Sequence, residues 1–185
     1  VASKGSAPYK AVCTHGWVVD GEGKAMHKSL GNAIAPEEMI VKYGADLVRL
    51  WVASSDYQVD VRVSDPIFKQ LSEAYRKIRN TARFILGNIC DFVPDTDMVS
   101  ADKLEEIDRW ALMRMDEVIK PCREAYENFE YHIIFHAIHN FCVIDMSNFY
   151  LDVIKDRLYV EKADSVTRRA AQTTIYRVLD TLTRL

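Results

Sequence analysis

The feature that most constrains the fold is an apolar repeat that runs from about residue 64 to the end of the chain. Apolar side chains recur there at spacings of three and four, the period of a helix with one buried face. Four such stretches, joined by short polar links, predict four amphipathic helices packed as an antiparallel bundle. The four predicted apolar stripes are Ile67, Leu71, Ala74, Ile78, Ala82, Ile85 and Ile89; Leu104, Ile107, Ala111, Met115, Val118, Cys122 and Ala125; Tyr131, Phe135, Ile138, Cys142, Met146, Phe149 and Val153; and Ala171, Ile175, Val178, Leu182 and Leu185.

The first 63 residues follow a different pattern. Residues 9–19 resemble a β-strand and are followed by turn residues at 20–23, so the chain is predicted to fold back on itself. Residues 37–43 and 45–54 predict two short helices separated by Gly44, the first opened by Pro36. We therefore predict a small α/β domain over residues 1–63 and a helical domain over residues 64–185. The fold class is mainly α.

Length, charge and cysteines exclude several classes of protein. A chain of 185 residues can bury a real core in one or two domains. No run approaches the ~18 apolar residues of a membrane span, so no membrane association is expected. A net charge of −3 requires that any contact with nucleic acid come from a local patch. Four widely spaced cysteines predict reduced thiols, with neither a disulfide framework nor a zinc site.

The two ends of the sequence lack boundary signals. The chain starts with Val1 in place of an initiator methionine, and its last predicted helix reaches Leu185 without a stop signal. We therefore expect an internal piece of a longer protein.

Residues 23–32, Gly-Lys-Ala-Met-His-Lys-Ser-Leu-Gly-Asn, carry the clearest chemical signal. They place Lys28 in a small loop with glycines on both sides. A lysine ammonium is a compact charge on a flexible stem, and glycines let a backbone approach a ligand closely. This arrangement suits a polyphosphate. Short motifs also match by accident, in which case Lys28 is a solvated surface lysine, so the flanking sequence has to decide.

The loop resembles the Lys-Met-Ser-Lys-Ser signature of class I aminoacyl-tRNA synthetases, and its flanks are similar to the isoleucyl branch of that family. Residues 54–62 favour this branch over the valyl and methionyl branches, which remain the alternatives within the family. A stand-alone helical RNA-binding module is the alternative outside it. The matching segments are residues 7–10, 14–16, 42–46, 49–57, 71–81, 107–112 and 149–159.

The resemblance implies a division of labour. Residues 1–63 would be the end of a Rossmann-type catalytic domain and its connecting piece, and residues 64–185 the start of an anticodon-binding domain. The parent would join isoleucine to ATP, used with Mg²⁺, and transfer it to isoleucine tRNA. It would be a cytoplasmic monomer. The other signature motif, the editing domain and the zinc region of the family are not in this sequence, so the 185 residues alone are expected to be inactive.

The resemblance also implies roles for single residues. Lys28 would be the catalytic cation that stabilises charge on the ATP phosphates, while Met26 anchors the loop and Ser29 shapes it. Two positions depart from the family pattern, because its first lysine is Ala25 here and its first serine is His27. Lys24 is placed to substitute in part, and His27 can donate a hydrogen bond. We expect ATP contacts from residues 24–29.

Residues 66–84 hold five basic side chains and one acidic side chain, whereas residues 102–130 are acidic. We predict that the basic residues contact tRNA phosphates. The alternative is that they cover a solvent face or pair with the acidic helix. A second basic cluster, around residues 155–157 and 168–169, is a further candidate. The predicted tRNA-binding residues of the first cluster are Lys69, Arg76, Lys77, Arg79 and Arg83.

His132, His136 and His139 share one predicted helix face. Metal sites use such spacing, but no carboxylate or cysteine completes a ligand set. We expect that these histidines bind no metal.

Overall fold

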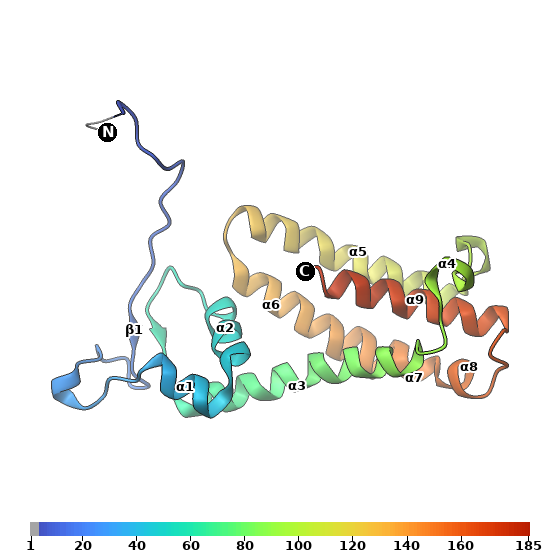
Figure 1. Cartoon of the computed structure of the whole chain (residues 1–185), viewed down its shortest axis with the longest axis horizontal. Helices are drawn as coiled ribbons and strands as arrows, with labels where there is room; N and C mark the ends of the chain where they lie inside the picture. The colour runs from blue at the N-terminus through green and yellow to red at the C-terminus, as the bar shows by residue number, and fades with distance from the viewer. Residues whose placement is uncertain (1–3) are drawn as a thin grey trace. The chain divides into compact units, whose positions relative to one another are not determined.

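The computed structural model describes residues 4–185, which form two compact units that divide between Phe68 and Lys69 (Figure 1). The predicted fold class is confirmed, because the chain is mainly helical with one small two-stranded sheet. Among the described residues, no helix combines the length and apolar character needed to cross a membrane.

Within residues 4–68 the first unit holds two short strands, three short helical segments and the first turn of α3 (Asp65–Asn88). Strands β1 (Val18–Val19) and β2 (Val61–Arg62) pair in parallel, with Val18 opposite Val61. The predicted strand over residues 9–19 is wrong in length, because only its last two residues form strand pairs with β2 and a strand extends only as far as its ladder partner. The helical segments are η1 (Lys28–Leu30), α1 (Pro36–Tyr43) and α2 (Ala45–Ser54).

The two short helices are confirmed almost to the residue. Pro36 occupies the first turn of α1, and Gly44 ends it with a φ of +90°, a conformation that glycine adopts without strain. Trp51 of α2 is buried, donates from Nε1 to the Arg62 carbonyl at 3.2 Å and packs against Phe68. These contacts hold the helix pair on the small sheet.

The second unit is an antiparallel bundle. Its long helical segments run in alternating directions (Figure 1). They are joined by the short helices α4 (Pro94–Asp97) and η2 (Ala101–Lys103), and by a polar turn before the last helix. The four successive arms of the bundle are α3 (Asp65–Asn88); α5 (Glu106–Glu127); the continuous run of α6 (Tyr131–Asn140), η3 (Phe141–Tyr150), α7 (Leu151–Val153) and α8 (Lys155–Tyr159); and α9 (Val166–Leu182).

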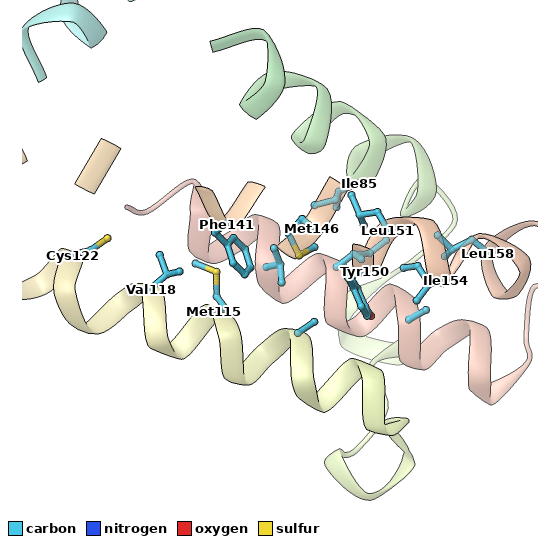
Figure 2. Packing of buried hydrophobic residues seen from close by; sticks show 14 of the residues in the cluster. Ile85, Met115, Val118, Cys122, Phe141, Met146, Tyr150, Leu151, Ile154 and Leu158 are labelled. Carbon is cyan, nitrogen blue, oxygen red and sulfur yellow. The ribbon is translucent and has the colours of Figure 1, made fainter. Parts of the chain in front are cut away.

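The third arm differs from its predicted stripe. Segment η3 is a π-helix, in which backbone bonds reach five residues back, so its buried face drifts relative to an α-helix. Phe149 and Val153, predicted to be buried, are therefore exposed, and Tyr150 and Ile154 take their place in the core. Figure 2 shows the π-helical side chains pointing between α5 and α9.

A buried carboxylate joins several elements of the bundle. Asp108, in the first turn of α5, has no exposed surface. Its oxygens accept hydrogen bonds from Tyr150 Oη at 2.7 Å and from the two terminal nitrogens of Arg157 at 2.9 and 2.8 Å. Arg157 also donates to the Thr167 carbonyl of α9. Burial, together with the Asp108 charge, raises the pKa of Tyr150, so its hydroxyl remains a donor at neutral pH.

A second polar cluster ties the end of α3 to α9. Asp91 accepts hydrogen bonds from Arg168 at 2.7 and 3.1 Å and from Gln172 at 2.8 Å. The hydrogen bonds from Arg168 are the main cause of a pKa for Asp91 of about 2. The carboxylate is therefore ionised, and paired, at neutral pH.

Arg157→Ala should destabilise the bundle by about 3–5 kcal/mol, because it leaves the charge of Asp108 buried without its partner. The measurement is the urea midpoint of the 185-residue chain. Arg184→Ala is the matched control, since Arg184 pairs with Asp180 on the surface and its removal should cost less than about 1 kcal/mol. Equal shifts of the two midpoints would contradict the importance of the buried pair.

Asp91→Asn should destabilise the chain by about 1 kcal/mol near neutral pH, a value reduced for the partial exposure of the carboxylate. The pKa of Asp91 is lower in the folded chain than in the unfolded chain. Its carboxylate therefore stabilises the fold above about pH 4, and this stabilisation disappears as the pH falls toward about 2. The difference in unfolding free energy between the two chains should therefore close over that range. A constant difference down to about pH 2 would show that the charge of Asp91 is not what matters.

Candidate functional site

The predicted lysine loop lies in the first unit and closes as a compact turn. Val19 and Ala25 form an antiparallel bridge, and the Asp20 N–H donates to the Lys24 carbonyl at 2.9 Å, so the chain folds back as predicted. The single turn η1 carries Lys28 and ends at Gly31, whose N–H donates to the Lys28 carbonyl. Gly31 has a φ of +69°, in the left-handed region that favours glycine.

Asn32 links the two ends of this loop. Its Nδ2 donates to Asp20 Oδ2 at 2.8 Å and to the Ala25 carbonyl at 3.1 Å, while its Oδ1 accepts from the His27 N–H at 2.9 Å. The Asp20 Oδ1 in turn accepts from the N–H groups of Glu22 and Lys24. The hydrogen bond from Asn32 is the main reason that the pKa of Asp20 lies below its usual value.

Lys28 is the lysine of the loop that is available to an anion. Its side chain is exposed, and none of the carboxylates in residues 4–185 lies within 4.0 Å of its ammonium. Lys24 instead pairs with Glu22 at 2.7 Å. Ala25, His27 and Ser29 are also exposed, so the structure presents residues 27–29 to solvent together on one turn.

Met26 lies on the other side of the loop. Its side chain is half-buried and lines an apolar cavity of about 380 Å³ with Met39, Trp51 and Phe68. The cavity lies within the first unit, so Met26 borders its apolar interior while Lys28 is exposed to solvent. A loop with a half-buried Met26 and an exposed Lys28 fits the binding of a charged ligand.

Sequence reasoning missed the residues that hold the loop. In the sequence Asp20 reads only as a turn residue, and Asn32 only as the last residue of the motif. Asp and Asn beside glycines commonly hydrogen-bond nearby backbone groups, which is the one sequence signal that points to both. Their contact across twelve residues comes from the fold alone.

The five predicted tRNA-binding residues are all exposed on α3. At roughly 100° per residue, Lys69, Arg76, Arg79 and Arg83 fall within about 80° of one another, opposite the buried Leu71 and Ile85. We call these four residues the basic face. The fifth, Lys77, lies on its flank.

The basic face is not neutralised by the acidic helix. Of the five predicted residues, Arg76 pairs with Glu73 on α3 at 2.6 Å. None of the five forms an ion pair with residues 102–130 in the part of the chain that the structure describes. The face therefore carries positive charge that is open to a polyanion.

The second predicted basic cluster is largely paired with carboxylates of the bundle. Arg157 is held by Asp108, and Arg168 and Arg169 are held by Asp91. Lys155 pairs with Asp152. The three arginines interact with carboxylates that the sequence places far away, so charge counting along the chain could not reveal the pairing.

The three histidines have different surroundings in the described chain. His139 stacks on Phe135 with ring centroids 6.0 Å apart, and His136 is exposed. The Nδ1 atom of His132 is buried without a hydrogen-bond partner among residues 4–185. Within the same residues, no three His, Cys, Asp or Glu side chains are grouped to hold a metal ion.

Comparisons with known proteins match the two ends of the chain to two domain families of tRNA synthetases. Residues 1–64 match the family of class I tRNA synthetases for I, L, M and V, and residues 108–185 match the anticodon-binding domain of tRNA ligases. The whole chain is 58% identical to an isoleucine–tRNA ligase of Syntrophotalea carbinolica and 60% identical to one of Natranaerobius thermophilus. It spans about 20% of the length of each.

A solved structure supports the fold. A leucyl-tRNA synthetase of Agrobacterium radiobacter K84, crystallised as a ternary complex with tRNA and LeuAMS, superposes with a TM-score of 0.69. The match covers 89% of this chain and 19% of that protein, at 17% sequence identity. At this identity the likeness concerns the fold.

Proposed function

Because the chain belongs to the class I tRNA synthetase family, we propose that it is part of an isoleucine–tRNA ligase. That enzyme activates isoleucine with ATP, releasing pyrophosphate, and transfers the isoleucyl group to its tRNA. The observation that carries this proposal is an identity of 58–60% along all 185 residues to isoleucine–tRNA ligases. This identity favours the isoleucyl branch over the valyl and methionyl alternatives, and a stand-alone RNA-binding module leaves the match over residues 1–64 without explanation.

We propose that residues 1–63 supply the ATP-phosphate loop of the catalytic domain and that residues 64–185 belong to the anticodon-binding domain. The match of the two family models to the two ends of the chain supports this division. Since the chain spans about a fifth of its relatives, we expect no catalysis from the 185 residues alone. We place the complete enzyme in the cytoplasm as a monomer.

In this proposal Lys28 is the catalytic cation. Negative charge grows on the β- and γ-phosphates as the bond to the α-phosphorus breaks, and a cation that approaches them then stabilises the transition state more than the ground state. The exposure of Lys28 and its lack of a carboxylate partner in the described chain support this role. His27 and Ser29 lie beside it, Lys24 and Ala25 precede it, and Met26 anchors the loop. Mg²⁺ would accompany the ATP phosphates, and we assign no residue of this chain to it.

Lys28→Ala in the full-length protein should lower isoleucine-dependent pyrophosphate–ATP exchange by about 10²–10³-fold, the usual cost of removing one transition-state contact. Lys24→Ala is the matched control in the same loop. Its ammonium is already paired with Glu22, so its removal should cost less than about tenfold. Equal reductions in the two variants would show that Lys28 is not the principal contact.

We further propose that the basic face of α3, with Lys77 on its flank, contacts tRNA phosphates. Arg79→Gln with Arg83→Gln should weaken tRNA binding by the full-length protein, and the slope of log affinity against log salt should fall by about one for each phosphate that is no longer bound. Affinity should fall for isoleucine tRNA and for a non-cognate tRNA alike, because phosphate contacts carry no sequence information. Pyrophosphate exchange should not change.

The matched control replaces two cations of the acidic helix α5, Lys120→Gln with Arg123→Gln, in the same full-length protein. It should leave both the affinity for tRNA and its salt dependence unchanged. A control that weakens binding as much as the α3 pair, or an α3 pair without effect, would contradict the assignment of the basic face.

A further inference from the structure

One polar contact closes the base of the loop that carries Lys28. Asp20 stands where the loop begins and Asn32 where it ends, and their side chains meet at 2.8 Å. Each also holds backbone groups on its own side: Asp20 accepts from Glu22 and Lys24, and Asn32 binds Ala25 and His27. We call this pair the loop clamp.

The clamp acts directly on the turn that carries Lys28. The His27 N–H is held by Asn32 at 2.9 Å, and the His27 carbonyl accepts the Leu30 N–H that closes η1. Lys28 itself forms no ion pair with the described residues, and the buried residues of the first unit include none of η1. Apolar packing therefore reaches the loop at Met26, while the backbone of Lys28 is set by hydrogen bonds.

We infer that Asp20 and Asn32 are positioning residues for Lys28, and that their mutual hydrogen bond sets the register of the phosphate-binding turn. This inference rests on the proposed function of the loop. Neither residue need touch ATP. The requirement is that one carries a carboxylate and the other an amide, because Asn32 Nδ2 must face an acceptor.

That complementarity allows a reciprocal exchange. Asp20→Asn sets two amides against each other, and Asn32→Asp sets two carboxylates against each other. The double variant restores one donor facing one acceptor across the pair, while the Ala25 carbonyl loses its donor and faces a carboxylate oxygen instead. Such a cycle separates the pair contact from the other contacts of each residue.

The experiment measures isoleucine-dependent pyrophosphate–ATP exchange in the full-length protein, with the unfolding midpoint of every variant. Each single variant should lower kcat by about tenfold or more, the usual effect of removing a hydrogen bond to a charged group. The KM for isoleucine and the midpoint should not change. The double variant should recover most of the kcat of the unmodified protein.

Glu22→Gln serves as the control, since it removes a surface charge of the same turn but no contact of the clamp. Single variants with unchanged kcat, or a double variant as impaired as the product of the singles, would overturn the inference. Single variants that lower the unfolding midpoint together with kcat would overturn it as well, because the loss of activity would then follow from a loss of stability. A wild-type protein without exchange activity would instead refute the proposed function.

Discussion

The bundle depends on the neutralisation of one buried charge. Asp108 has no access to water, so its charge must be compensated by protein groups, and Arg157 and Tyr150 provide them. Arg157 lies on α8 and Tyr150 on the π-helix, and Arg157 also donates to the Thr167 carbonyl of α9. All these contacts can therefore form only when the elements take one relative register. Apolar packing alone would tolerate small shifts between helices, whereas a bidentate ion pair does not.

The π-helix makes this network possible. An α-helix through the third arm would carry the apolar stripe through Phe149, as the sequence pattern predicts. The wider turn instead brings Tyr150 into the core beside Asp108 and leaves Phe149 against Trp110 at the surface. Thr81 of α3 packs on the same segment, where its hydroxyl contacts the Cys142 carbonyl and Ser147. The irregular helix is thus supported by polar contacts on two sides.

The lysine loop follows a different principle from the bundle. Its residues are mostly exposed, and hydrogen bonds among Asp20, Asn32 and the backbone define its shape. Exposed hydrogen bonds with few apolar contacts hold a segment less firmly than a packed core does. A loop of this kind can keep a defined turn and still move when a ligand binds, which is compatible with the role proposed for Lys28.

The sequence by itself determined where the helices of both units lie and where the candidate site lies. Helical periodicity identified the four arms of the bundle, Pro36 and Gly44 delimited the first short helix, and the motif located Lys28, because each of these signals is local to the chain. Only the tertiary structure decided what lies far apart in sequence. It paired Asp108 with Arg157, Asp91 with Arg168 and Asp20 with Asn32, and it turned Tyr150 inward. Charge and periodicity show which residues need a partner, but the partner is set by distances that exist only after the chain has folded.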